Sequence, residues 1–277
     1  MQDYIVGFLE GHKGVKLCYR FYPADNSVAR IIFLHGAGEY SEKYTRFAEW
    51  FSSRNIEVFL LDMRGHGRSG GPMCHVSDFK DYALDLDIFL KFADNGWGAR
   101  KIFLVAHSLG GLVAMYYSLH FPYQLHGVIA CSPCLGLRLR IEPVKAWLAI
   151  LFSKFLADKP FASNIRPRIA THDKYILEKF RKDPLIHHVV TASFYVQLKF
   201  AMRHLKEHAQ DFKEPISILQ AGDDKICDCR AAEKFYNALG STDKKFKTYP
   251  GFYHELLNEV DREEAYNDIY SWLKDRC

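Results

Sequence analysis

Residues 101–117 read KIFLVAHSLGGLVAMYY, and this stretch determines the fold class. Its first half is an apolar run typical of a buried strand, and its second half is typical of a helix. A serine on so sharp a strand-to-helix turn points its hydroxyl outward, beside helix N-terminal N–H groups that can stabilise an anion. The turn needs small residues two positions before and after the serine, which Ala106 and Gly110 supply. Because a serine that only caps a helix has no such need, the pattern predicts that Ser108 is a nucleophile.

The composition is that of an ordinary globular protein. The chain has 277 residues, 48% hydrophobic and 25% charged, which fits one large domain with an insertion. A net charge of +4 is too small to indicate a nucleic-acid partner. Seven cysteines, an odd number, favour free thiols, and Cys131 and Cys134 are expected to be buried thiols rather than a metal or redox pair. With neither a signal-peptide pattern nor a membrane-spanning apolar run, the sequence predicts a cytoplasmic protein.

Strands alternate with helices along most of the chain. Strands are predicted at 4–9, 15–21, 29–34, 56–62, 101–107, 127–131, 216–221 and 244–249. Helices are predicted at about 41–54, with Ser41 as the N-cap, and at 78–93, 112–117 and 262–274. A further helix is predicted to begin near Cys229. The first two strands form an antiparallel hairpin, and the later alternation predicts a mostly parallel eight-stranded sheet with helices on both faces.

The alternation stops between 134 and 214, where we find helical periodicity and no convincing strand. We therefore expect a helical cap, or lid, at 134–214, inserted after the sixth strand into a core of 1–133 and 215–277. The cap holds fifteen Lys and Arg against eight Asp and Glu, a net charge of +7. Its apolar, lysine-bearing stretch 144–156 either contacts an anionic lipid surface transiently or packs over the active-site mouth.

A serine nucleophile needs a base, and the base needs an acid that orients it. Asp223 and Asp224 directly follow the strand at 216–221, and His254 follows the strand at 244–249. The chain order serine, acid, histidine is the one expected of an α/β-hydrolase. Spacing alone does not separate the two aspartates, and either one has an alternative role as a cap of the following helix.

An oxyanion intermediate needs two backbone N–H donors. One is expected from Leu109, directly after the nucleophile, and the other from Ala37 in the loop that follows the strand at 29–34. We expect His35 to hold that loop, and His66 to occupy a tight turn, since ligands at workable spacing for a metal are lacking around it.

With these residues assembled, the chain resembles the monoacylglycerol lipase and lysophospholipase branch of the α/β-hydrolases. Six motifs carry the resemblance: HGAGEYSEKY at 35–44, DMRGHGRSGG at 62–71, AHSLGG at 106–111, DPLI at 183–186, QAGDDKICD at 220–228 and YPGFYHELLNE at 249–259.

The resemblance implies further roles. It places the acid of the triad at Asp224 rather than Asp223, and it again implies Ala37 and Leu109 as the oxyanion donors. In that family the residues after the HGAG loop help to hold the glycerol end of the substrate, which here implicates Glu39 and Lys43. By the same resemblance, Lys43 stands at a position where the glycerol lipases have arginine.

These observations predict a serine carboxylester hydrolase that cleaves a single-chain lipid, monoacylglycerol or lysophospholipid, through an acyl-enzyme on Ser108. We expect it to need neither a metal nor an organic cofactor, and to lie in the cytoplasm, peripheral to a membrane where the cap docks. The alternatives within the fold are a short-chain esterase, a thioesterase and a serine aminopeptidase. A catalytically silent binding protein on the same fold is the alternative of another class.

Overall fold

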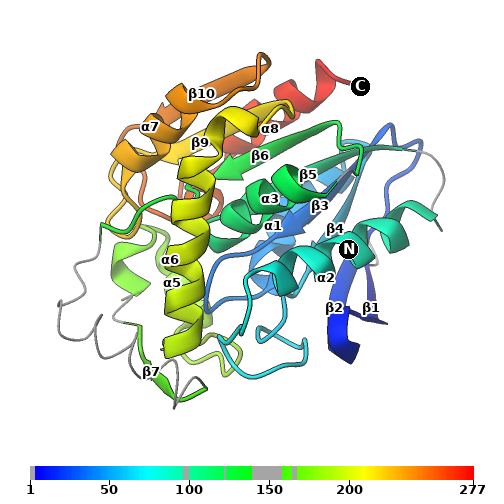
Figure 1. Cartoon of the computed structure of the whole chain (residues 1–277). Helices are drawn as coiled ribbons and strands as arrows, with labels where there is room; N and C mark the ends of the chain where they lie inside the picture. The colour runs from blue at the N-terminus through cyan, green and yellow to red at the C-terminus, as the bar shows by residue number, and fades with distance from the viewer. Residues whose placement is uncertain (1–3, 96–99, 122, 139–157, 164–166) are drawn as a thin grey trace.

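An eight-stranded sheet runs through the centre of the molecule (Figure 1). The computed structural model describes residues 4–95, 100–121, 123–138, 158–163 and 167–277. The strands of this sheet are β1 (Ile5–Glu10), β2 (Lys16–Tyr22), β3 (Ala29–Leu34), β4 (Ile56–Leu61), β5 (Lys101–His107), β6 (Gly127–Cys131), β9 (Ile216–Ala221) and β10 (Lys244–Tyr249).

The strand order is β1-β2-β4-β3-β5-β6-β9-β10. β1 and β4 pair antiparallel with β2, and every other neighbouring pair in this sheet is parallel. β3, β4, β6 and β9 are buried along their whole length, as strands covered on both faces must be. The carboxyl ends of the parallel strands therefore meet at one edge, which the mostly parallel prediction anticipated.

Helices cover both faces of the sheet. α2 (Lys80–Asn95), α3 (Leu109–His120), α6 (Ala192–Glu207) and α7 (Cys229–Ala238) contribute to the apolar core on one face. α1 (Thr45–Ser52) and α8 (Glu263–Lys274) contribute to the core on the other. The remaining described elements are α5 (Lys174–Phe180), β7 (Pro160–Ala162), β8 (Val189–Thr191) and the 3₁₀ turns η1 (His12–Gly14), η2 (Ser41–Tyr44), η3 (Pro167–Ile169), η4 (Ala209–Asp211) and η5 (Leu256–Asn258).

The helix predicted at 41–54 is shorter, and Ser41 does not cap it. Ser41 begins the 3₁₀ turn η2, and α1 starts only at Thr45. The backbone N–H of Ser41 donates to Asp62 Oδ1 at 2.8 Å, and its hydroxyl accepts from Arg20. Because these long-range partners take its polar groups, Ser41 has no role at the N-terminus of α1.

The prediction of a strandless segment at 134–214 is wrong. β7 and β8 pair antiparallel as a separate two-stranded ribbon. A strand of three residues is too short to show the two-residue alternation of apolar and polar side chains by which a strand is predicted. In addition, β8 runs directly into α6, whose N-cap is Thr191. The lysine-bearing stretch 144–156 lies outside the described residues. Within those that are described, no helix has the length and apolar character to cross a membrane.

The turn between β5 and α3 packs tightly against the end of β3. Ser108 has φ 52° and ψ −113°, a conformation that non-glycine residues adopt only where packing imposes it. A Cβ on Gly110 would lie 2.5 Å from the carbonyl oxygen of Leu34 and 2.7 Å from that of His35. Backbone oxygens cannot yield as a flexible side chain can, so this close approach requires glycine.

Gly110→Ala is therefore expected to lower the free energy of unfolding by about 2–3 kcal/mol, because the strand and helix must separate to admit the methyl group. Gly70→Ala is the matched control, since a Cβ there meets its nearest atoms at 3.5 Å. Urea denaturation measures both. Equal stabilities for the two variants would contradict the close-packed turn.

Candidate active site

Three side chains from distant parts of the sequence meet at the carboxyl edge of the sheet. His254 Nε2 lies 2.9 Å from Ser108 Oγ, and His254 Nδ1 lies 2.7 Å from Asp224 Oδ2. Ser108 follows β5, Asp224 follows β9 and His254 follows β10. Spacing left two aspartates open and the resemblance implied Asp224; the structure places Asp224 against the histidine. The backbone N–H of Asp223 instead donates to the carbonyl of Phe252.

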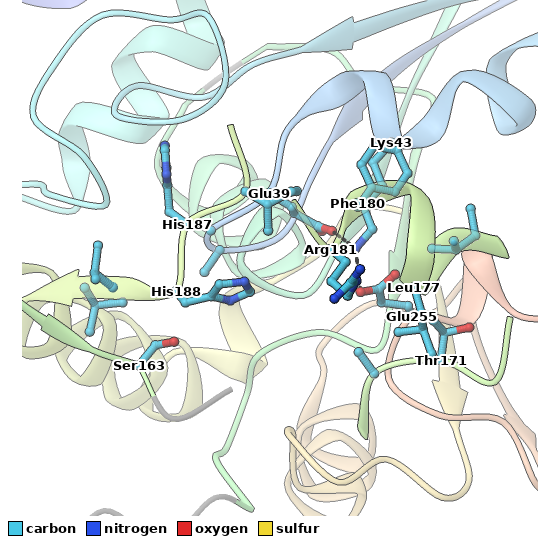
Figure 2. Close-up of a pocket in the computed structure, with 17 residues that line it drawn as sticks. Glu39, Lys43, Ser163, Thr171, Leu177, Phe180, Arg181, His187, His188 and Glu255 are labelled. Atoms are coloured by element: carbon cyan, nitrogen blue, oxygen red, sulfur yellow. Dashed lines mark hydrogen bonds and ion pairs between the residues drawn. The ribbon is translucent and has the colours of Figure 1, made fainter. Parts of the chain in front are cut away.

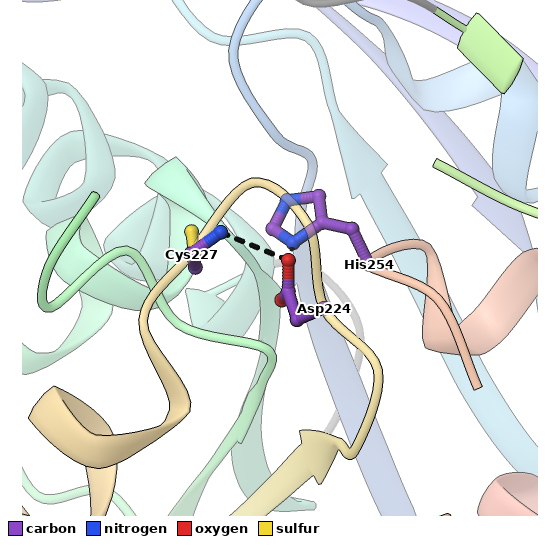
Figure 3. Close-up of side chains that lie close together, drawn as sticks. All are labelled: Asp224, Cys227 and His254. Atoms are coloured by element: carbon purple, nitrogen blue, oxygen red, sulfur yellow. Dashed lines mark hydrogen bonds and ion pairs between the residues drawn. The ribbon is translucent and has the colours of Figure 1, made fainter. Parts of the chain in front are cut away.

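The surroundings of Asp224 keep it ionised. Its Oδ1 accepts from the backbone N–H groups of Ile226 and Cys227, each at 2.8 Å. Figure 3 shows Cys227 and His254 on opposite sides of the carboxyl group. Burial alone would raise the pKa of Asp224, but the charge and hydrogen bond of His254, with the two backbone donors, hold that pKa below its usual value.

The same contact makes His254 a stronger base. Burial alone would lower the pKa of His254, but the carboxylate of Asp224 outweighs it and raises that pKa above the usual value. Because an ionised carboxylate only accepts hydrogen bonds, Nδ1 carries the proton of the neutral imidazole. Nε2 is then free to accept from the hydroxyl of Ser108. Chemically, this arrangement can take a proton from a serine nucleophile.

One predicted oxyanion donor lies in the serine turn, and the other lies in the loop after β3. Leu109 is the first residue of α3, so its N–H has no partner within the helix. Ala37 lies in the loop after β3, and this loop is fixed at several points. The N–H of Gly110 donates to the carbonyl of His35 at 3.1 Å, and His35 Nε2 accepts from the N–H of Met63 at 3.0 Å. His35 thus holds the loop, as predicted.

Glu39 anchors the same loop from within the protein. Its Oε1 accepts from three donors: the Gly36 N–H at 2.6 Å, the Tyr44 hydroxyl at 2.7 Å and His107 Nδ1 at 3.0 Å. Its Oε2 accepts from Lys43 Nζ at 2.9 Å. Burial would raise the pKa of Glu39, but Lys43 and His107 hold that pKa well below its usual value. All of these contacts require an ionised carboxylate.

Lys43 is shared between two carboxylates. Besides Glu39, its ammonium donates to Glu255 Oε1 at 2.5 Å. Burial would lower the pKa of Lys43, but Glu255 and Glu39 together raise it, so the ammonium stays charged. The resemblance implied Glu39 and Lys43 as substrate-binding residues, whereas Glu255 was not predicted from the sequence. The available signal was its position directly after His254, on the loop that brings the histidine to the site.

A cavity that opens to solvent adjoins the loop of the predicted oxyanion donor. Its polar lining includes Glu39, Lys43 and Glu255, and its apolar wall comes largely from α5 and β8. Figure 2 shows Arg181 and Glu255 on one side of the cavity and His188 on the other. Ala37 also lines it, so a molecule held there lies beside the loop of the predicted oxyanion donor.

Asp224, Cys227 and His254 also present ligand atoms within 4.8 Å of one another, among the residues that the structure describes. However, Asp224 already accepts from two backbone N–H groups and from the histidine. His254 in turn contacts the serine through its other nitrogen. The ligand positions are thus already in use, and the group fits a serine–histidine–acid site better than a metal centre.

The chain is similar to several known proteins. The sequence model of the family described as serine aminopeptidase, S33, matches residues 25–261. A putative monoglyceride lipase from Schizosaccharomyces pombe is 31% identical over 90% of the chain and 68% of the relative. Phospholipase YtpA from Bacillus subtilis is 28% identical over 88% of the chain and 95% of the relative.

One further relative is much longer than this chain, and one similar protein has a solved crystal structure. The chain spans only 27% of an uncharacterised abhydrolase domain-containing protein from Dictyostelium discoideum, at 28% identity over 92% of the chain. The crystal structure of a soluble variant of monoglyceride lipase from Saccharomyces cerevisiae, in complex with a substrate analog, superposes with a TM-score of 0.88. That match covers 100% of this chain and 96% of the yeast one, at 24% identity.

The raised pKa of His254 leads to a pH prediction. His254 must be neutral to accept the serine proton, so activity falls as the pH drops through its pKa, and the acid limb lies above about pH 6.5. In Asp224→Asn the charge that raises this pKa is gone while burial remains, so the limb moves to lower pH, and the rate drops roughly 10⁴-fold. A pH-stat assay at high enzyme concentration measures both. An unchanged acid limb in the variant would contradict the assigned pairing.

Proposed function

The chain belongs to the α/β-hydrolase family described as serine aminopeptidase, S33, and we propose that within it this protein is a carboxylester hydrolase that cleaves a single-chain lipid. The proposed substrate is a monoacylglycerol or a lysophospholipid. The observation that carries the proposal is the chain of contacts from Asp224 through His254 to Ser108, at 2.7 and 2.9 Å. Relatives named monoglyceride lipase and phospholipase support a lipid ester as the substrate class.

In the proposed reaction, His254 takes the hydroxyl proton as Ser108 Oγ attacks the ester carbonyl. The backbone N–H groups of Ala37 and Leu109 stabilise the oxyanion. His254 then gives its proton to the departing alcohol, which leaves the acyl group on the serine. Water, activated by the same histidine, hydrolyses this acyl-enzyme, and Asp224 orients and stabilises the imidazolium throughout. Every proton in this sequence passes through one histidine.

The polar end of the cavity is the proposed headgroup site. Lys43 donates to Glu39 and Glu255, which leaves one ammonium N–H for a ligand. Glu255 retains acceptor capacity on its carboxylate. A donor beside an acceptor matches a pair of hydroxyl groups, such as those on glycerol. Glu39 contributes chiefly by fixing Lys43 and the oxyanion loop, because its own oxygens already have partners inside the protein.

Residues 134–214 are proposed as a cap over this site, between core segments 1–133 and 215–277. Two of its elements, α5 and β8, line the cavity, which supports a role in holding substrate. Contact of the basic cap with a membrane, and a cytoplasmic location, remain predictions from the sequence.

A serine aminopeptidase is the second candidate, favoured by the description of the matching family. Such an enzyme needs carboxylates for the substrate ammonium. Glu39 and Glu255 lie at the cavity, but Lys43 already neutralises one of their two charges. A single remaining charge is a weaker ammonium site than a free carboxylate pair, so we favour the esterase.

Hydrolysis of p-nitrophenyl esters from acetate to palmitate tests the proposed function, with an aminoacyl nitroanilide as the peptidase substrate. We expect activity to rise toward medium or long acyl chains, and Ser108→Ala to reduce it by about 10⁴-fold. Activity confined to acetate and butyrate would indicate a small-ester hydrolase instead. Cleavage of the nitroanilide alone would support the aminopeptidase, and the absence of Ser108-dependent turnover would favour a silent binding protein.

Glu255→Gln tests the headgroup site. The amide keeps the volume but loses the charge that pairs with Lys43, so KM for a monoacylglycerol is expected to rise about tenfold. A p-nitrophenyl ester of the same acyl chain lacks the glycerol, and its kcat/KM should stay within about threefold. Equal losses on both substrates would mean that Glu255 acts on the catalytic centre rather than on the headgroup.

A further inference from the structure

Two histidines face each other away from the active site, where α6 crosses α3. His120 is the last residue of α3, and His204 lies in the last turn of α6. Their Nε2 atoms are 2.7 Å apart on the exposed surface. α6 packs against α3 in this region, and Figure 1 shows the two helices crossing. One Nε2–H therefore donates to the other Nε2, so two different helices bring two imidazole nitrogens together.

A third histidine adjoins this pair. His208 follows α6 and lies one helical turn from His204, with the two ring centroids 4.4 Å apart. Its Nδ1 lies 2.9 Å from Asp211 Oδ2. A carboxylate that accepts from one imidazole nitrogen fixes the proton there and leaves the other nitrogen bare, which is how metal-binding histidines are commonly held. Spacing i, i+4 also places His204 and His208 on the same helix face.

We propose that His120, His204 and His208 form a binding site for a divalent cation of the Zn²⁺ class, supported by Asp211 behind His208. Neutral imidazoles are good ligands for Zn²⁺, and water can complete a tetrahedral set. Zn–N bonds of about 2.0–2.1 Å put two ligand nitrogens roughly 3.3 Å apart, so the His120–His204 pair must open by about half an ångström. The nitrogens of the three histidines do not all lie within 4.8 Å of one another in this structure, so His208 must turn toward the pair while it keeps its contact with Asp211.

The surroundings allow such a turn and a positive charge. The rings lie near the surface, between the aromatic rings of Tyr116 and Phe200, which contact them at centroid distances of 4.6–5.6 Å. Lys80 places a positive charge near His120, whereas Glu207 places a negative one near His204. Glu207 also pairs with Arg203 at 2.8 Å, so these side chains provide no net attraction for a cation and its binding rests on the imidazoles.

A bound ion would join the helix that begins at the serine turn to the last helix of the proposed cap. The site lies at the far end of α3 from Leu109, so the ion would stabilise the packing of the two helices without entering the catalytic centre. The inference stands on the histidine geometry and does not depend on the proposed ester hydrolysis.

Isothermal titration of the full chain with Zn²⁺ tests the site. We expect one ion per chain, and a melting temperature raised by about 5 °C at a free zinc concentration 100 times the Kd. His120→Asn and His204→Asn should each weaken binding at least tenfold. Asp211→Asn should weaken it about tenfold, because the carboxylate touches only the ligand and not the ion. His12→Asn, a partly exposed histidine near Asp81, is the matched control and should leave binding unchanged.

Co²⁺ as a second probe separates this site from the cluster around Cys227. Imidazole and water ligands give visible d–d bands only, whereas a thiolate ligand adds intense near-ultraviolet charge-transfer bands. Bands that disappear in Cys227→Ala but persist in His204→Asn would place the ion in the active site and overturn the proposal. So would zinc affinity that is equal in the wild type and His204→Asn, or an absence of binding at millimolar zinc.

Discussion

The buried carboxylate of Glu39 is the constraint on which the geometry of the active site depends. It accepts from Gly36 in the oxyanion loop, from His107 beside the serine, and from Lys43, which in turn contacts Glu255 on the histidine loop. A buried charge is tolerated only when its oxygens are hydrogen-bonded, so the ionised Glu39 depends on its direct donors. The three loops that carry the proposed oxyanion donor, the proposed nucleophile and the proposed base are thereby held in one arrangement.

The sheet supplies the positions that this carboxylate links. Parallel strands bring the ends of β5, β9 and β10 to one edge, so residues separated by 146 positions in sequence, Ser108 and His254, meet at 2.9 Å. The unfavourable backbone conformation of Ser108 persists because Gly110 lets α3 approach the end of β3 closely. The packing of the core thus stabilises the conformation that exposes the serine hydroxyl to the base.

Most of the fold was predictable because the central strands are continuous apolar runs with clear ends. The strands at 29–34, 101–107, 127–131 and 216–221 were predicted with the bounds that the structure has. The contacts that depend on tertiary structure were not. Asp223 and Asp224 follow the same strand, so spacing could not separate them, and the choice of Asp224 came from the resemblance alone. Glu255 escaped notice because its partner Lys43 lies 212 residues away, and the ribbon of β7 and β8 is too short to show periodicity.

The central claim, that His254 and Asp224 activate Ser108 as a nucleophile, is tested most directly by labelling with a fluorophosphonate and locating the adduct by mass spectrometry. The account predicts one adduct, on Ser108, that forms at least about 10³-fold more slowly in His254→Ala, because the serine then lacks its base. Melting temperatures would show that the variant is folded. An adduct on another residue, or equal labelling rates in the wild type and His254→Ala, would contradict it.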